Sequence, residues 1–278
     1  MTNKPYNYDE GLGTVYERIM LNDYFDGLLD KESISTVLEA PFFGMTGLTG
    51  INSVHFAQRG CHVTLVDAKD AYVEEARYLW EDLQLHDRLT LVRSDFGAAL
   101  PFADRSFDFV WNFAALWHWQ GAADLLAELC RVAKRYVFIA MPNNKQIGYF
   151  LRKKWLDKEF FDTVDESWMN LSKSRKIVED NGFKIVDHAV LDVPPWPDTC
   201  MPVGVLLEKL GLAKKGKKKE TEGEKGGWNW DIMRYYAGED PGFKDRVEKY
   251  AFVERLPIYW KIKIVWAHHR YFLAERQG

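Results

Sequence analysis

The feature that most constrains the fold is an alternation of short apolar runs with longer amphipathic segments. Five β-rich, almost continuously apolar runs have helix-like stretches between them: 35–40, 62–67, 89–95, 107–113 and 135–143. Continuous apolar strands are typical of sheets buried on both faces, which arise when helices connect parallel strands. The pattern therefore predicts an α/β fold with a doubly wound, mostly parallel sheet between layers of helices.

The rest of the chain predicts additions to this core. Apolar residues at helical spacing indicate a helix over 13–30, and 172–193 has the pattern of a helix followed by a strand. The last strand is expected near 258–274. The expected division is an N-terminal helical cap (1–34), a core (35–193 and 257–278) and an insertion or lid (194–256) with a flexible Lys- and Gly-rich segment.

Composition excludes several classes of protein. Lys plus Arg is 37 and Asp plus Glu is 41, and the net charge of −4 argues against a general nucleic-acid binder. Cys61, Cys130 and Cys200 are too far apart for a disulfide framework or a zinc site, so we expect no metal and a cytoplasmic location. The first residues do not show the basic-then-apolar pattern of a secretory signal, and no run approaches about 18 consecutive apolar residues, so we expect neither a signal peptide nor a membrane span. We expect a small-molecule partner and no stable membrane insertion; peripheral membrane contact and the oligomeric state stay open.

Polar side chains follow four of the expected strands at the points where the strands end. In open parallel sheets, ligands bind beyond the carboxyl ends of the strands. Glu39 precedes a Gly-rich loop, and Asp67 stands where nucleotide-binding proteins hold a ribose diol. Asp95 next to Phe96 suits an adenine amino group and ring, and Asn112 follows the fourth strand. The alternative is that the acids are solvated strand ends and that Phe96 is an ordinary core residue.

The order of these features resembles the class I S-adenosylmethionine-dependent methyltransferases. LPFADRSFDFVWNFAALWHW (100–119) is similar to their small-molecule branch, and HHRYFLAE (268–275) is similar to that branch's reversed final strand. The resemblance covers about 35–200 and 256–276. It implies a Rossmann-like sheet of seven strands with the last one reversed and a helical insertion before it. It also implies S-adenosyl-L-methionine as the cofactor.

By this resemblance, the Gly-rich loop wraps the methionine part of the cofactor and Asp67 takes both ribose hydroxyls. Asp95 would accept from the adenine amine, and Phe96 would flank the ring. The family's loop reads acid-x-Gly-x-Gly-x-Gly, whereas Pro41 and Phe43 stand here in place of the first two glycines and the loop is longer. The expected cofactor-binding residues are Glu39, Pro41, Gly44, Gly47, Asp67, Asp95, Phe96 and Asn112.

The expected substrate contacts follow the fourth strand. Trp117 and Trp119 flank His118, whose ordinary pKa near neutrality suits a general base; fixing the loop by a hydrogen bond is an equal alternative. Aromatic residues are also dense in the insertion, as at Trp196 and Tyr235. The main hypothesis is therefore in-line methyl transfer to a small aromatic or lipophilic acceptor, in a pocket roofed by the N-terminal helix and the insertion.

Two other functions remain open. The altered Gly loop fits a catalytically inactive protein that binds the cofactor or a partner. A nicotinamide-dependent dehydrogenase is weaker, because no Gly-x-Gly-x-x-Gly follows the first strand. Two motifs favour structural roles: Pro194-Pro195-Trp196 predicts a rigid turn, and the lysine run 214–219 a solvated hinge.

Overall fold

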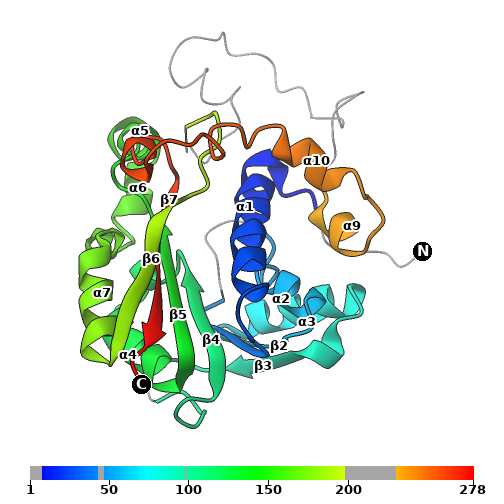
Figure 1. The fold of residues 1–278 in the computed structure, drawn as a ribbon, viewed down its shortest axis with the longest axis vertical. Helices are drawn as coiled ribbons and strands as arrows, with labels where there is room; N and C mark the ends of the chain where they lie inside the picture. Colours follow the sequence, from blue (N-terminus) through cyan, green and yellow to red (C-terminus); the bar gives the residue numbers. More distant parts are fainter. Residues whose placement is uncertain (1–7, 43–46, 98, 198–229) are drawn as a thin grey trace.

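The computed structural model describes residues 8–42, 47–97, 99–197 and 230–278. Its centre is a seven-stranded sheet in the order β3-β2-β1-β4-β5-β7-β6 (Figure 1). Strands β1 to β5 pair in parallel, whereas β7 is antiparallel to both β5 and β6. The strands are β1 Thr36–Glu39, β2 His62–Asp67, β3 Leu89–Arg93, β4 Phe107–Phe113, β5 Ala133–Pro142, β6 Phe183–Leu191 and β7 His269–Arg276. The predicted α/β class and the reversed last strand are confirmed.

Helices cover both faces of the sheet, which explains why its central strands are almost continuously apolar. All seven residues of β4 are buried. Phe109 and Trp111 face one core cluster, and Val110 faces the other. The first cluster lies under α1 Gly11–Leu29, α2 Val54–Gln58 and α3 Asp70–Asp82, and the second under α4 Ala122–Val132 and α7 Leu171–Asp180.

The region before the last strand differs from the sequence expectation. The last strand begins at His269, because β5 and β6 both end opposite this residue and offer no earlier partner. The preceding stretch forms the short helix α11 Trp260–Lys263 instead. Further short elements are η1 His86–Arg88, η2 Leu116–His118, α5 Ile147–Leu151, η3 Arg152–Leu156, α6 Lys158–Phe161, η4 Glu166–Met169, α9 Ile232–Tyr236 and α10 Phe243–Glu248. The lysine run 214–219 and the stretch 203–212, whose apolar spacing predicts a helix, lie outside the described residues.

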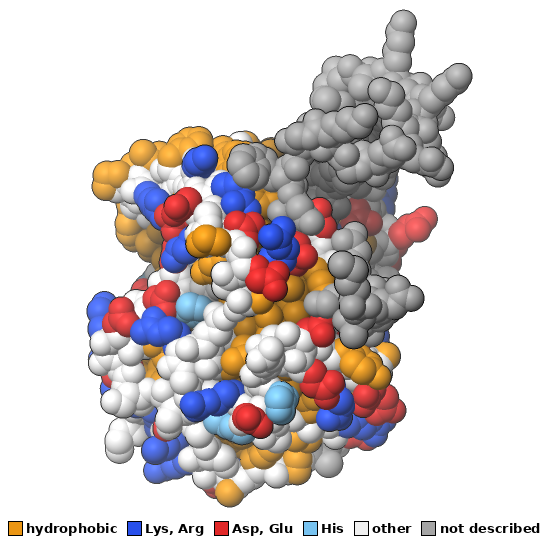
Figure 2. Space-filling model, turned by 90° about the vertical axis from the view of Figure 1, so that its right-hand side faces the viewer, with side chains coloured by type: hydrophobic (Ala, Val, Ile, Leu, Met, Phe, Trp, Pro, Cys, Tyr) orange, Lys and Arg blue, Asp and Glu red, His pale blue; other side chains and the backbone are white. Residues whose placement is uncertain are grey.

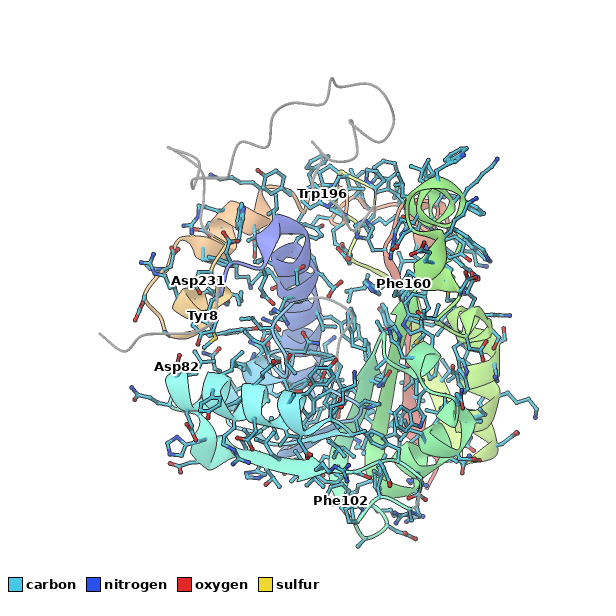
Figure 3. All side chains as sticks on the ribbon, turned by 180° about the vertical axis from the view of Figure 1, so that it is seen from behind. Tyr8, Asp82, Phe102, Phe160, Trp196 and Asp231 are labelled. Carbon is cyan, nitrogen blue, oxygen red and sulfur yellow. The ribbon has the colours of Figure 1, made fainter. Side chains whose placement is uncertain are left out.

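Helix α1 packs between the sheet and the short helices that precede β7. Its Asn22 donates to the Tyr236 hydroxyl at 2.9 Å, and Asp23 pairs with Lys244 at 2.5 Å. Before α1, the Tyr8 hydroxyl donates to Asp82 of α3 at 2.8 Å (Figure 3). No helix in the described part of the chain is both long and apolar enough to span a bilayer.

Candidate active site

The three predicted acids lie at the carboxyl edge of the sheet. Glu39 pairs with Leu65, two residues before Asp67. The Ser94 amide donates to the Asp67 carbonyl at 2.9 Å, which ties the loop carrying Asp95 to the end of β2. Asp67 also raises the pKa of Glu39 through its charge, though less than burial does. The parallel register therefore gathers on one edge residues that are far apart in the sequence.

Glu39 is a buried carboxyl group held by neutral donors. It accepts from the Ser53 hydroxyl at 2.6 Å, and the Trp111 indole donates to the same hydroxyl at 3.1 Å. Burial raises the pKa of Glu39 to about 8, against the opposing effect of hydrogen bonds from Ser53 and Asn52. The nearby Arg18 guanidinium is already paired with a different carboxylate. Glu39 is therefore protonated at neutral pH and would ionise on meeting a cation.

Asn112 holds the loop that follows β1. Its side-chain amide donates to the carbonyls of Ala40 at 3.0 Å and Pro41 at 3.4 Å, and its carbonyl accepts from the Ala115 amide at 3.3 Å. Asn112 is fully buried and Pro41 is buried beside it. Both residues therefore fix the path of the loop backbone.

The glycines of this loop allow close approach to helices. Gly47 has a φ of +85°, and a Cβ there would lie 2.8 Å from Thr14 and 2.9 Å from Arg18 of α1. Gly50 has a φ of +75°, and its Cβ would lie 2.7 Å from that of Ala76 on α3. Gly44 lies outside the described residues. Gly47 and Gly50 thus let the loop pack on α1 and α3.

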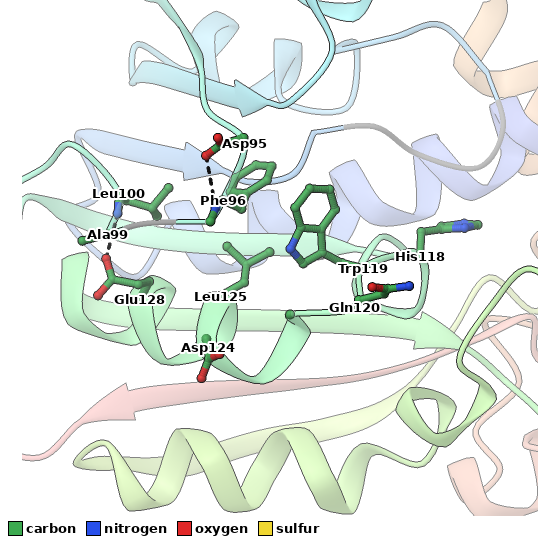
Figure 4. Close-up of a pocket in the computed structure, with 12 residues that line it drawn as sticks. Asp95, Phe96, Ala99, Leu100, His118, Trp119, Gln120, Asp124, Leu125 and Glu128 are labelled. Atoms are coloured by element: carbon green, nitrogen blue, oxygen red, sulfur yellow. Dashed lines mark hydrogen bonds between the residues drawn. The ribbon is translucent and has the colours of Figure 1, made fainter.

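A pocket of about 740 Å³ opens between the loop after β3 and the first turns of α4 (Figure 4). Phe96 and Trp119 meet edge to face in its wall, with ring centroids 5.0 Å apart. The exposed carboxylate of Asp95 lies beside them and accepts from the Gly97 amide at 3.1 Å. The pocket thus combines aromatic surface with a hydrogen-bond acceptor. Other residues that line it include His118, Gln120, Leu125 and Glu128.

Trp117 and His118 have different surroundings. Trp117 is only 1% exposed, and its indole donates to the Ala114 carbonyl at 2.9 Å. The structure places Trp117 in a core cluster and not in the lining of this pocket, whereas Trp119 lines the pocket. His118 also lines the pocket, where burial and then the charge of Lys69 lower its pKa. The imidazole is therefore neutral at pH 7, the form that can accept a proton.

A second ionisable cluster, which the sequence reasoning missed, lies at the same edge beyond β5. The Asp192 carboxylate lies 3.1 Å from His268 Nδ1 and 3.3 Å from His269 Nδ1, and Glu17 of α1 lies 3.7 Å from His269. The His269 ring also stacks obliquely on Phe113 at the end of β4, with centroids 4.6 Å apart. The sequence feature that could have located this cluster is the reversed last strand. A reversed strand begins at the edge where the parallel strands end, so its first residues lie beside the ends of those strands.

Charge is balanced within this cluster. Burial raises the pKa of Glu17 to about 7. Burial opposes ionisation of Asp192 as well, but His268 and then His269 lower its pKa through their charges and hydrogen bonds. Burial likewise opposes ionisation of His269, whereas Glu17 and then Asp192 raise its pKa. Donor atoms of Glu17, Asp192 and His269 lie within 4.8 Å of one another, so within the described ranges they are the group that could hold a metal ion. Their internal pairing suits proton exchange without one.

Comparisons with known proteins agree with this geometry. A family model described as a methyltransferase domain matches residues 45–141. A search of the curated proteins gave no match. Among solved structures, magnesium protoporphyrin IX methyltransferase from Synechocystis PCC 6803, crystallised with bound SAH, is 14% identical; the match covers 99% of this chain and 90% of that one, with a TM-score of 0.54.

Two further structures are similar at the level of the fold. The MccD protein is 13% identical over 92% of this chain and 96% of its own, with a TM-score of 0.55. The [4+2]-cyclase SpnF is 15% identical over 93% of this chain and 81% of its own, with a TM-score of 0.53. Because these identities are low, the likeness establishes the architecture alone.

Proposed function

We propose that this chain is a class I S-adenosylmethionine-dependent methyltransferase that acts on a small aromatic or lipophilic acceptor, because a methyltransferase domain model matches residues 45–141 and the sheet has the order and reversed last strand that the resemblance implies. The observation that carries the proposal is the gathering of Glu39, Asp67 and Asp95 at one sheet edge, next to an aromatic pocket. A cyclase among the structural neighbours shows that the architecture alone does not fix the reaction.

The proposed cofactor-binding residues are assigned to different parts of the cofactor according to their positions along the sheet edge. Asp67, at the end of β2, is proposed to accept from the ribose hydroxyls. Asp95 is proposed to accept from the adenine amine and Phe96 to contact the ring, because both line the 740 Å³ pocket. Glu39 is proposed to face the ammonium group of the methionine part, since a buried protonated carboxyl gains a partner by ionising there.

Methyl transfer needs positioning more than proton chemistry. When bound, the cofactor would supply the methyl group from its sulfonium, and Glu39, Asp67 and Asp95 would hold the cofactor at the sheet edge. The chain's task is alignment and exclusion of water. An acceptor that loses a proton would pass it to His118 in the pocket or to His269, which Asp192 orients.

Calorimetry with S-adenosylmethionine and S-adenosylhomocysteine tests the proposal. The wild-type chain should bind both. Asp67→Asn removes a charged acceptor and should weaken binding about 10- to 100-fold. Asp70→Asn, a matched change at a largely exposed aspartate three residues further on, should leave it unchanged. Folded protein that binds neither compound would overturn the proposal.

A panel of aromatic and lipophilic acceptors with a labelled methyl donor then tests turnover. If a proton is removed, His269→Asn or His118→Asn should lower kcat, and the sensitive variant identifies the base. Tight cofactor binding without turnover on any acceptor would favour the alternative of an inactive cofactor- or partner-binding protein.

A further inference from the structure

Large hydrophobic side chains are exposed together at one end of the molecule. Of the eleven such side chains in the described residues, six form what we call the apolar platform, and each is 42–62% exposed. They lie on α5, on η3 and in the stretch around α11. The apolar platform consists of Phe150, Trp155, Ile258, Tyr259, Ile262 and Val265.

The two stretches that carry the platform lie against each other. The Ile147 amide donates to the Val265 carbonyl at 3.1 Å, and the Asn143 side chain donates to the Ile264 carbonyl at 2.6 Å. Aromatic side chains cover roughly 150–250 Å² each and those of Ile and Val less, so the six at about half exposure present on the order of 500 Å². The largest apolar patch on a typical monomer covers about 300–600 Å² and is often functional, so the platform is a candidate interaction surface.

Positive charge accompanies the platform. Residues 147–156 and 255–266 each contain three Lys or Arg and no Asp or Glu, although the whole chain is acidic. Among the described residues, Lys154 and Lys261 form no ion pair. Their ammonium groups lie instead 4.9 Å from the Trp155 ring centroid and 5.4 Å from that of Tyr259. Figure 2, which is drawn from the side of α9 and α10, shows hydrophobic side chains with basic ones among them at the upper left of that face.

The platform lies at the end of the molecule where the parallel strands of the sheet have their carboxyl ends. Helix α5 follows β5, and α11 precedes β7, whose first residue pairs with the last of β5 (Figure 1). Trp and Tyr together with Lys, on a face that is otherwise aliphatic, are the side chains that favour the interface of a bilayer with anionic headgroups. A soluble acidic partner would account for the lysines but leave the aliphatic residues in water.

We propose that the apolar platform docks this chain on the surface of a membrane that contains anionic lipid, with its aromatic and aliphatic side chains in the headgroup region and Lys154 and Lys261 against lipid phosphates. This orientation turns the ligand-binding edge of the sheet toward the bilayer. A lipophilic acceptor could then enter from lipid, which links the docking to the proposed function. The docking itself needs neither cofactor nor acceptor, so it can fail independently.

Sedimentation with vesicles tests the proposal, with phosphatidylcholine alone compared with phosphatidylcholine plus phosphatidylglycerol. The full chain should sediment with the anionic vesicles, and less so as salt rises. The double variant Trp155→Ser, Ile262→Ser should bind at least about tenfold more weakly. Lys154→Gln with Lys261→Gln should cost about 30-fold on anionic vesicles. Tyr78→Ser, an equally exposed aromatic on α3, is the control and should bind as wild type does.

The same samples supply the outcomes that would overturn the docking. One is that the wild-type chain binds neither kind of vesicle. The other is that Tyr78→Ser weakens binding as much as the platform variants do. Sedimentation equilibrium gives another: a wild-type dimer that Ile262→Ser dissociates would make the platform an interface between two copies. Circular dichroism melts verify that the variants stay folded, as expected for exposed positions.

Discussion

Replacement of Glu39 by glutamine should change how stability depends on pH. The side chain is buried, and burial raises its pKa to about 8 from an ordinary value of 4.5. Between these values the folded chain keeps the proton and the unfolded chain releases it. Since the native state then binds more protons, stability falls as pH rises through this window.

The size of the effect follows from the linkage relation. One proton of difference costs about 1.4 kcal/mol per pH unit. From pH 5.5 to 7.5, Glu39 is mostly protonated in the folded chain and mostly ionised in the unfolded chain. Glu39 should therefore remove about 2 kcal/mol of stability over that interval. Glu39→Gln keeps an oxygen that can accept from Ser53 and carries no titrating proton, so this loss should disappear.

Urea unfolding of the cofactor-free protein at the two pH values measures the difference. Glu17 and Glu254, whose pKa values burial raises to about 7, contribute equally to both proteins and cancel. Glu74→Gln, on the exposed side of α3, is the control and should retain the wild-type pH dependence. Identical pH dependence in wild type and Glu39→Gln would refute the reasoning, because it would mean that Glu39 is ionised in the folded chain.

Two further changes test local structure. Burial opposes ionisation of Asp108, but hydrogen bonds from Ser35 and Thr36 hold its pKa below the ordinary value, so its stabilisation is complete above about pH 4 and fades as pH falls. Asp108→Asn should therefore cost about 2 kcal/mol in urea unfolding at pH 7 and less at pH 3; an equal cost at both would contradict this. Gly50→Ala adds a Cβ that contacts α3 at a positive φ, whereas Gly60→Ala adds one in open space at a φ of +91°. Thermal melts should show a loss of about 1 kcal/mol for Gly60→Ala and clearly more for Gly50→Ala.

Much of the sheet could be predicted from local pattern. An apolar run such as 107–113 is recognisable as a buried strand, because covering both faces demands continuous apolar residues, and β4 occupies those residues. The acid after each strand could likewise be placed at the ligand edge, since all parallel strands end there. The last strand was placed too early, because β-rich composition does not show where its neighbours end.

The sequence by itself determined the order of the elements, the edge on which Glu39 and Asp67 lie, and the aromatic residue beside Asp95, because periodicity and strand ends are local properties of the chain. Tertiary structure alone decided that Trp117 is buried while Trp119 lines a pocket, and that Asp192 meets two histidines across a reversed strand. Burial and proximity depend on segments distant in the sequence, and these set both the raised pKa of Glu39 and the exposure of the apolar platform.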